Sequence, residues 1–209
     1  MITKEKFREE IDLFAQRGIF IDPEPYKLQV AQPKETLQAG LNVVMRHEVM
    51  WLKEYDEVAD WLGNNQGKGL LLVGPVGVGK TELCMKVIPI IIHLTKRQFV
   101  SRYSATDLLI PEKYSEVMKR TLIVIDDVGT EAMYNNYGTQ HNVFSEVVDR
   151  IEKDGILLLA STNLSDNELL KKYGVRTMDR IRANMRMVIF DEPSLRGKFP
   201  KKWLEQSCP

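Results

Sequence analysis

Residues 70–81, LLLVGPVGVGKT, place a run of apolar side chains directly before the pattern G-x-x-x-x-G-K-T, which occupies residues 74–81. The apolar run predicts a buried strand, and a helical pattern begins after Lys80. Gly77 and Gly79 allow the backbone to turn with its N–H groups facing inward, and the positive end of the following helix points to the same place. The stretch therefore predicts a phosphate-binding loop between a strand and a helix.

Most residues of this loop have an expected role. Lys80 would reach the β- and γ-phosphates of a nucleotide, and the hydroxyl of Thr81 would bind Mg²⁺. The expected nucleotide-binding residues are Gly74, Pro75, Val76, Gly77, Val78, Gly79, Lys80, Thr81 and Glu82.

The remainder of the chain after residue 63 alternates apolar runs with helical patterns, which predicts an α/β fold with a parallel sheet. The five expected strands are GLLLVG (69–74), QFVSRYS (98–104), TLIVID (121–126), ILLLAST (156–162) and MRMVIF (185–190). Each is apolar enough to be buried on both faces. Helices are expected at 81–95, with a kink at Pro89, and at 140–153, closed by Gly155. Ser165 and Glu168 have the spacing of a capping box and would open one more helix.

The residues before the phosphate-binding loop have a different pattern. Phe7, Ile11 and Phe14 recur at helical spacing within residues 3–17, which predicts an amphipathic helix that either packs on the core or binds a partner. Residues 21–36 contain three prolines and predict an extended linker, and residues 33–62 return to a helical pattern. We expect an N-terminal helix and linker at 1–40, an ATPase-type core at 41–200 and a basic tail at 201–209.

Composition limits the class of protein. The 209 residues are 44% hydrophobic and 28% charged with a formal net charge of zero, which fits one globular core. Cys84 and Cys208 lack the spacing of a metal site, and the charged start MITKEKFREE has no apolar signal region. No apolar run approaches the roughly twenty residues of a membrane span. We therefore expect a cytoplasmic protein, with positive charge gathered near its C-terminus: residues 171–209 contain ten Lys or Arg against four Asp or Glu.

Two carboxylates end the third expected strand. Asp126 is placed to hold Mg²⁺ opposite Thr81, directly or through water. Asp127 would then orient or deprotonate an attacking water molecule. The alternative is that Asp127 is a solvated strand-end carboxylate, since aspartate reaches less far than the usual glutamate. Glu131, four residues later, could compensate for that shorter side chain.

The fourth strand also ends in polar residues. Ser161, Thr162 and Asn163 follow the apolar run ILLLA. An amide at this position could lie beside the γ-phosphate, hold the water and sense hydrolysis. Asn163 by itself is equally typical of a turn, and its place after two phosphate-site elements favours the sensor role.

In combination these motifs resemble those of the AAA+ ATPases, with Walker A at 74–81, Walker B at 122–127 and Asn163 as sensor 1. Within that superfamily the chain resembles the DnaC/DnaI/IstB group of helicase loaders and transposition helper ATPases. The segments that carry the likeness are VIDDVGTE, STNLS, YGVRTMDRI and FDEPSLRG, within residues 67–197. The resemblance implies an AAA+ core without a C-terminal helical lid, hydrolysis of ATP to ADP and phosphate with Mg²⁺, and a loader-type role in DNA replication or mobile-element movement.

The resemblance also implies a role for the arginines in YGVRTMDRIRANMR. In oligomeric AAA+ proteins an arginine on the helix after sensor 1 reaches the ATP of the neighbouring subunit. By its place in MDRI, Arg180 is the candidate catalytic arginine, and Arg176, one turn earlier, is the second choice. Arg182 and Arg186 are expected to be surface charge or contacts to a phosphate backbone.

The partners implied by the resemblance are a second copy of the chain, in an ATP-dependent oligomer, and a replicative helicase, an initiator or a transposase. Single-stranded DNA is a further candidate partner, which would bind through Lys198, Lys201 and Lys202 with Phe199 and Trp203. The alternative is that these residues form a tail with no ligand. Residues 109–121 are shorter than the corresponding DnaC segment, which weighs against DNA binding. Two other functions stay open: an ATP-gated oligomeric scaffold with negligible turnover, and a small-molecule P-loop kinase.

Overall fold

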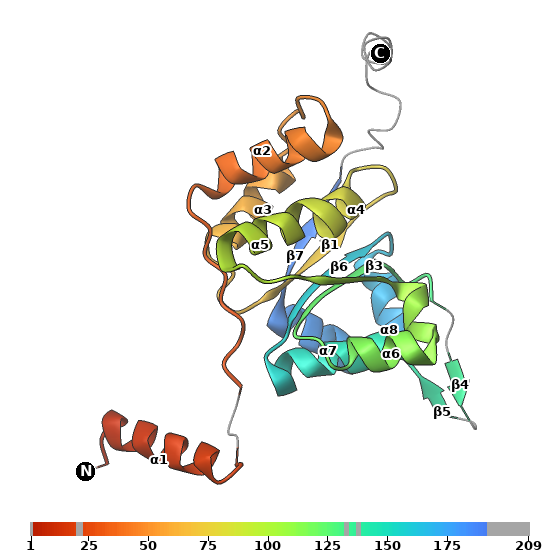
Figure 1. Cartoon of the computed structure of the whole chain (residues 1–209). Helices are drawn as coiled ribbons and strands as arrows, with labels where there is room; N and C mark the ends of the chain where they lie inside the picture. The colour runs from red at the N-terminus through yellow and green to blue at the C-terminus, as the bar shows by residue number, and fades with distance from the viewer. Residues whose placement is uncertain (1, 20–22, 132–133, 137–138, 192–209) are drawn as a thin grey trace.

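The computed structural model describes residues 2–19, 23–131, 134–136 and 139–191. Its centre is a parallel five-stranded sheet with the strand order β2-β3-β6-β1-β7 (Figure 1). The strands are β1 (Gly69–Val73), β2 (Ser101–Ser104), β3 (Leu122–Val128), β6 (Leu157–Thr162) and β7 (Met185–Ile189). Each of the five apolar runs forms one of them, which confirms the α/β fold with a parallel sheet.

Helices cover both faces of this sheet (Figure 1). One layer contains α2 (Pro33–Met45), α3 (Lys53–Gly63) and α5 (Ile88–Lys96), and the other contains α6 (Pro111–Val117), α7 (Val143–Asp154) and α8 (Asp166–Asn184). Alternate residues of β1 face the two layers: Leu70 and Leu72 belong to the first core cluster, and Leu71 and Val73 to the second. Both faces of the sheet are thus buried, as in most parallel sheets.

The helical segment after the phosphate-binding loop changes its hydrogen-bonding pattern twice. It consists of α4 (Lys80–Glu82), the π-helical turn η1 (Leu83–Val87) and α5. Pro89 has no N–H to donate to the carbonyl of Met85 four residues earlier. The guanidinium of Arg102 donates to that carbonyl at 3.0 Å instead. Where a kink at Pro89 was expected, the structure has a π-helical turn just before the proline.

The helical pattern at 33–62 corresponds to two helices rather than one. Arg46, with φ of 60°, ends α2 in a left-handed conformation. The connection to α3 folds back on α2, because Asn42 Oδ1 accepts from Val49 N at 2.8 Å and Gln38 Nε2 donates to Val49 O at 3.1 Å. This local capping by side chains breaks a helix that apolar spacing alone would continue.

The helix expected at 140–153 begins three residues later. Asn142 caps α7 by accepting from Ser145 N at 3.3 Å. The preceding residues form β5 (Thr139–His141), which pairs with β4 (Tyr134–Asn136) in a hairpin that the sequence did not predict. The expected end at Gly155 and the capping box of Ser165 and Glu168 are both confirmed.

The segment expected to be a linker packs on the core. Leu28 and Val30 are buried in the first core cluster. The side chain of Asn65 holds this segment, since its Oδ1 accepts from Leu28 N at 2.8 Å and its Nδ2 donates to Tyr26 O at 2.9 Å. The expected boundary at residue 40 falls inside α2, and the tail at 201–209 and the predicted lack of a helical lid lie outside the described residues. The division into domains stays a prediction.

Helix α1 (Lys4–Gln16) is present as predicted, but none of its residues is buried. Figure 1 shows it away from the two helical layers. Phe7 is 61% exposed, and Ile11 and Phe14 are exposed as well. In this structure the helix therefore does not pack on the core, and its role stays a prediction. Among the residues that the structure describes, no helix is long and apolar enough to cross a membrane.

Asn65→Ala should lower the free energy of unfolding by about 2 kcal/mol, because the buried N–H of Leu28 and carbonyl of Tyr26 lose their partner. Chemical denaturation measures this difference. The matched control is the exposed neighbour Asn64, whose Ala variant should cost less than about 0.5 kcal/mol. Equal losses in the two variants would contradict the role of Asn65 in holding residues 26–28.

Candidate functional site

The phosphate-binding loop connects β1 to α4 and requires glycine at three positions. Gly74, Gly77 and Gly79 have φ of 148°, 92° and 94°, which side chains other than glycine rarely adopt. A Cβ at Gly74 would also lie 2.5 Å from the carbonyl oxygen of Phe190 at the end of β7. The glycines that the sequence pattern singled out are therefore fixed by backbone geometry and by close packing of the loop on β7.

This loop forms one wall of a pocket of about 340 Å³. The loop and strand ends contribute residues 76–82, Asp127 and Asn163 to the lining, so most of the predicted nucleotide-binding set lies there. The mostly apolar part of the lining comes from α2, α3 and their connection, through Leu41, Met45, His47, Val49 and Tyr55. These five residues were missed from the sequence, because the break between α2 and α3 that brings them to the loop was not predicted.

Lys80 joins the loop to the end of β6. Its side chain is 5% exposed, and its Nζ donates to Gly74 O at 2.7 Å, to Pro75 O at 2.9 Å and to Asn163 Oδ1 at 2.9 Å. Burial lowers the pKa of the Lys80 ammonium below its ordinary value, while the charges of Asp127 and Asp126 oppose that shift. The ammonium thus lies in the pocket near two carboxylates and three oxygen acceptors.

Asp126 is buried at the end of β3 and lies between two hydroxyl groups. Thr81 Oγ1 donates to Asp126 Oδ1 at 3.2 Å, and Ser161 Oγ donates to the same oxygen. A carboxylate beside a threonine hydroxyl supplies the hard oxygen ligands that Mg²⁺ takes together with phosphate and water. The two predicted metal ligands therefore lie together and fit a magnesium site, with Ser161 as an additional neighbour.

Asp127 lines the pocket in a left-handed conformation with φ of 56°. The ladder between β3 and β6 shifts register between Ile125 and Val128, so the two aspartates occupy an irregularity of the strand. Asn163 Nδ2 donates to Asp127 Oδ1 at 3.3 Å. Lys80, Asn163 and Asp127 are thus joined in one hydrogen-bonded chain.

Glu131 does not share the pocket with Asp127. It is 3% exposed, and its carboxylate accepts from Gly129 N at 2.8 Å and from the hydroxyl of Tyr173. Its oxygens are therefore engaged within the protein, and the expectation that Glu131 replaces Asp127 as the water-activating carboxylate is not met.

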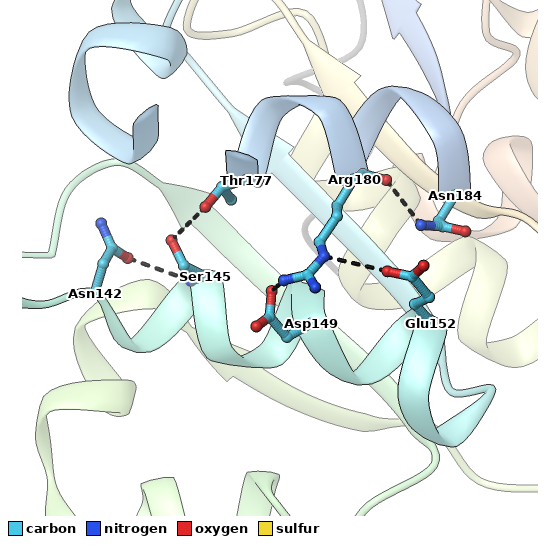
Figure 2. Close-up of polar contacts among 7 residues, drawn as sticks. All are labelled: Asn142, Ser145, Asp149, Glu152, Thr177, Arg180 and Asn184. Carbon is cyan, nitrogen blue, oxygen red and sulfur yellow. Dashed lines mark hydrogen bonds and ion pairs between the residues drawn. The ribbon is translucent and has the colours of Figure 1, made fainter. Parts of the chain in front are cut away.

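Arg180 lies on a different part of the molecule, on α8 facing α7 (Figure 2). Its Nε donates to Glu152 at 3.1 Å and its Nη1 to Asp149, which leaves the side chain 20% exposed. These contacts, chiefly the hydrogen bond to Asp149, raise the pKa of the guanidinium. Arg180 does not line the pocket of its own chain. Its action on a neighbouring subunit stays a prediction.

The other arginines of this segment, Arg176 and Arg182 on α8 and Arg186 on β7, differ in their surroundings. Arg176 is exposed and lines a shallow groove of α8 together with Asp179, Arg180 and Glu152. Arg182 donates to Asp166 at 2.7 Å, and Arg186 donates to Glu57 O at 3.5 Å. All three side chains are solvent-accessible, which fits the surface charge expected of Arg182 and Arg186 and leaves the role of Arg176 as a second candidate arginine a prediction.

By sequence, no protein-family model and no curated protein matches the chain. Several solved structures are similar to it in fold, among them the following three. The DnaC helicase loader has a TM-score of 0.53 at 17% identity, over 77% of this chain and 100% of the other. DnaI has a TM-score of 0.55 at 19% identity, over 78% and 96%. AMPPCP-bound DnaA from Aquifex aeolicus has a TM-score of 0.51 at 18% identity, over 76% and 53%.

At these identities the likeness establishes the fold. The chain has an α/β fold with a parallel five-stranded sheet, similar to that of the DnaC, DnaI and DnaA structures, which are P-loop AAA+ proteins. This confirms the fold expected from the motifs.

The backbone of Asp127 can be tested through stability. Asp127→Asn should change the free energy of unfolding by less than about 0.5 kcal/mol, because asparagine tolerates a left-handed conformation. Asp127→Ala should lower it by about 1 kcal/mol, since alanine does not. Chemical denaturation of both variants provides the comparison, and equal stabilities would argue against the left-handed backbone at this position.

Proposed function

We propose that this protein binds ATP with Mg²⁺ and hydrolyses it to ADP and phosphate, as a loader-type accessory in DNA replication or mobile-element movement. The observation that carries the proposal is the hydrogen-bonded chain Lys80, Asn163, Asp127 at the edge of a phosphate-binding loop. The DnaA structure with the similar fold contains the nucleotide AMPPCP, and the similar DnaC structure is that of a helicase loader.

The roles of the residues follow from their chemistry. The loop N–H groups and the Lys80 ammonium would bind the phosphates. Asp127 would accept a proton from the attacking water. The water oxygen would bond to the γ-phosphorus as the bond between that phosphorus and the ADP oxygen breaks. Asn163, which donates to Asp127 in this structure, would keep that carboxylate and the water in place. Thr81 and Asp126 would hold Mg²⁺, which neutralises phosphate charge when bound.

The apolar side of the pocket supports a site for the base. Leu41, Met45, Val49 and Tyr55 line the same pocket as the phosphate-binding loop. A flat heteroaromatic base buries its faces against such side chains, while its phosphates remain on the polar side. We propose that the adenine lies there, against the connection between α2 and α3.

Assembly of subunits is part of the proposal. Arg180 would reach the γ-phosphate of a neighbouring copy and stabilise charge there. In this structure Asp149 and Glu152 of its own chain hold the guanidinium. To act there, the guanidinium would exchange these two carboxylates for a phosphate group, which accepts charge-assisted hydrogen bonds in the same way.

Helix α1 is the proposed contact with a protein partner. Phe7, Ile11 and Phe14 form an exposed apolar stripe on a helix with no buried residue. The proposed partner is a replicative helicase, with an initiator or a transposase as the alternatives. Direct binding of single-stranded DNA would rest on residues 198–203, which the structure does not describe.

Two variants should separate binding from hydrolysis. Lys80→Ala removes the ammonium beside the phosphate site and should weaken ATP binding by at least about tenfold. Asp127→Asn should keep ATP affinity within about twofold but lower turnover by about 10²-fold or more, because it removes the base. Equilibrium binding of a fluorescent ATP analogue and release of inorganic phosphate provide the two readouts.

Product analysis decides among the three candidate functions. Free phosphate that depends on Asp127 supports hydrolysis. ATP binding without turnover in the wild type would contradict hydrolysis and leave the ATP-gated scaffold. A phosphorylated small molecule would instead identify a kinase.

Arg180→Ala should abolish the rise of turnover with protein concentration, lowering turnover in the assembled state by about 10³-fold while ATP affinity is kept. Phosphate release per protomer is measured against protein concentration. Arg182→Ala is the matched control, since Arg182 lies on the same helix and pairs with Asp166. Turnover that does not depend on concentration and survives Arg180→Ala would rule out the role of Arg180 in a neighbouring site.

A further inference from the structure

The turn that follows β3 fixes the backbone of Asp127 from both sides. The N–H of Asp127 donates to Ser161 Oγ at 3.1 Å. Its carbonyl accepts from Thr130 N at 3.1 Å and from Thr130 Oγ1 at 2.8 Å. These contacts stabilise the left-handed conformation of Asp127, which is uncommon for residues other than glycine. The position of its carboxylate therefore depends on the turn at residues 127–131.

Glu131 closes this turn from inside the protein. Its Oε2 accepts from Gly129 N at 2.8 Å. Gly129 has φ of 105°, and a Cβ there would lie 2.4 Å from a methyl carbon of Leu164, the residue after Asn163. The turn is thus packed against the loop that carries Asn163, and the buried carboxylate of Glu131 holds it there.

Helix α8 supplies the remaining partners of Glu131. The hydroxyl of Tyr173 donates to Glu131 Oε1, and Tyr173 is only 7% exposed. Lys172 Nζ donates to Gly129 O and to Glu131 O, each at 2.7 Å. The ring of Tyr173 packs on Phe144 with centroids 5.1 Å apart, so the hydroxyl is presented from a fixed position. Two adjacent residues of one helix therefore clamp the turn.

We propose that Tyr173 and Glu131 are positioning residues for hydrolysis, which hold the turn at 127–131 so that the Asp127 carboxylate stays beside Asn163. The proposal rests on the hydrolytic function proposed above. The carboxylate of Glu131 is buried and contacts neither Lys80 nor the pocket. Burying a carboxylate is costly unless its oxygens are hydrogen-bonded, and here the turn and Tyr173 supply those bonds. The clamp ends at Gly174, where a non-helical backbone with φ of 78° and ψ of 168° kinks α8, and Arg176 and Arg180 lie on the segment that follows the kink.

Tyr173→Phe removes only the hydroxyl and leaves Glu131 Oε1 without its donor. We expect kcat to fall by about tenfold or more while the Kd for ATP stays within about twofold, because a small displacement of a catalytic group affects the reaction more than binding. Amide hydrogen exchange at Gly129 and Thr130 should accelerate, since the turn opens more often. Lys172→Met removes the other half of the clamp, at a partly exposed residue. It should also lower kcat and accelerate the exchange of the Gly129 and Thr130 amides.

Tyr114→Phe is the matched control. The hydroxyl of Tyr114 donates to Glu146, joining α6 to α7 by the same pair of residue types away from the turn at 127–131. This variant should leave kcat and the exchange of the turn within about twofold of the wild type, even if its thermal stability falls as in Tyr173→Phe.

The outcomes separate the positioning role from the function. Loss of kcat and faster exchange in Tyr173→Phe and Lys172→Met, but not in Tyr114→Phe, would support the proposal. Wild-type kcat and unchanged exchange in both clamp variants would overturn it. If the wild type hydrolyses no ATP, the proposed function fails, and hydrogen exchange decides the clamp by itself: a turn that exchanges at the wild-type rate in Tyr173→Phe refutes it.

Discussion

The ammonium of Lys80 is the interaction on which the site depends. A buried positive charge is tolerated only where oxygen acceptors surround it, and Lys80 has two loop carbonyls and the side chain of Asn163 within 2.9 Å. The carbonyls belong to the loop after β1, and Asn163 follows β6, the parallel neighbour of β1. One side chain thus holds the ends of two strands together and gives the phosphate site its charge.

A second polar group supports the same edge of the sheet from β3. Asp126 is buried and accepts from Thr81 and Ser161, so it joins the first helix after the loop to the end of β6. The carboxyl ends of parallel strands meet at one edge, where open α/β sheets bind their ligands. Residues distant in sequence converge there because β6 lies between β1 and β3 in the sheet.

The surface that carries Arg180 is built separately, from α7 and α8. Thr177 Oγ1 on α8 donates to Ser145 Oγ on α7 at 3.0 Å and joins the two helices, and Asn184 Nδ2 donates to Arg180 O at 3.1 Å within α8 (Figure 2). Two carboxylates, those of Asp149 and Glu152, pair with the single guanidinium of Arg180, so these three side chains together carry a negative charge. The clamp from Tyr173 and Lys172 to the turn after β3 connects this surface to the pocket.

The sequence by itself determined the sheet and the polar residues at its edge. Apolar runs of strand length mark β1, β2, β3, β6 and β7. Asp126 and Asp127 lie within β3, Asn163 directly follows β6, and Lys80 and Thr81 follow the loop after β1. Their convergence follows from local patterns because parallel strands all end at the same edge. The need for glycine at positions 77 and 79 could also be predicted from the sequence, because it depends only on the local backbone conformation of the loop.

Only the tertiary structure decided the contacts that depend on how separate elements pack. The apolar side of the pocket required the break at Arg46, which Asn42 and Gln38 stabilise through hydrogen bonds that apolar periodicity does not register. In the sequence, Glu131 was a candidate to compensate for the short side chain of Asp127. In the structure its carboxylate is instead hydrogen-bonded to Tyr173 of α8. Arg180 has its acidic partners on α7, some thirty residues earlier. Such roles depend on side-chain partners brought together from distant parts of the chain, and neither spacing nor composition encodes those pairings locally.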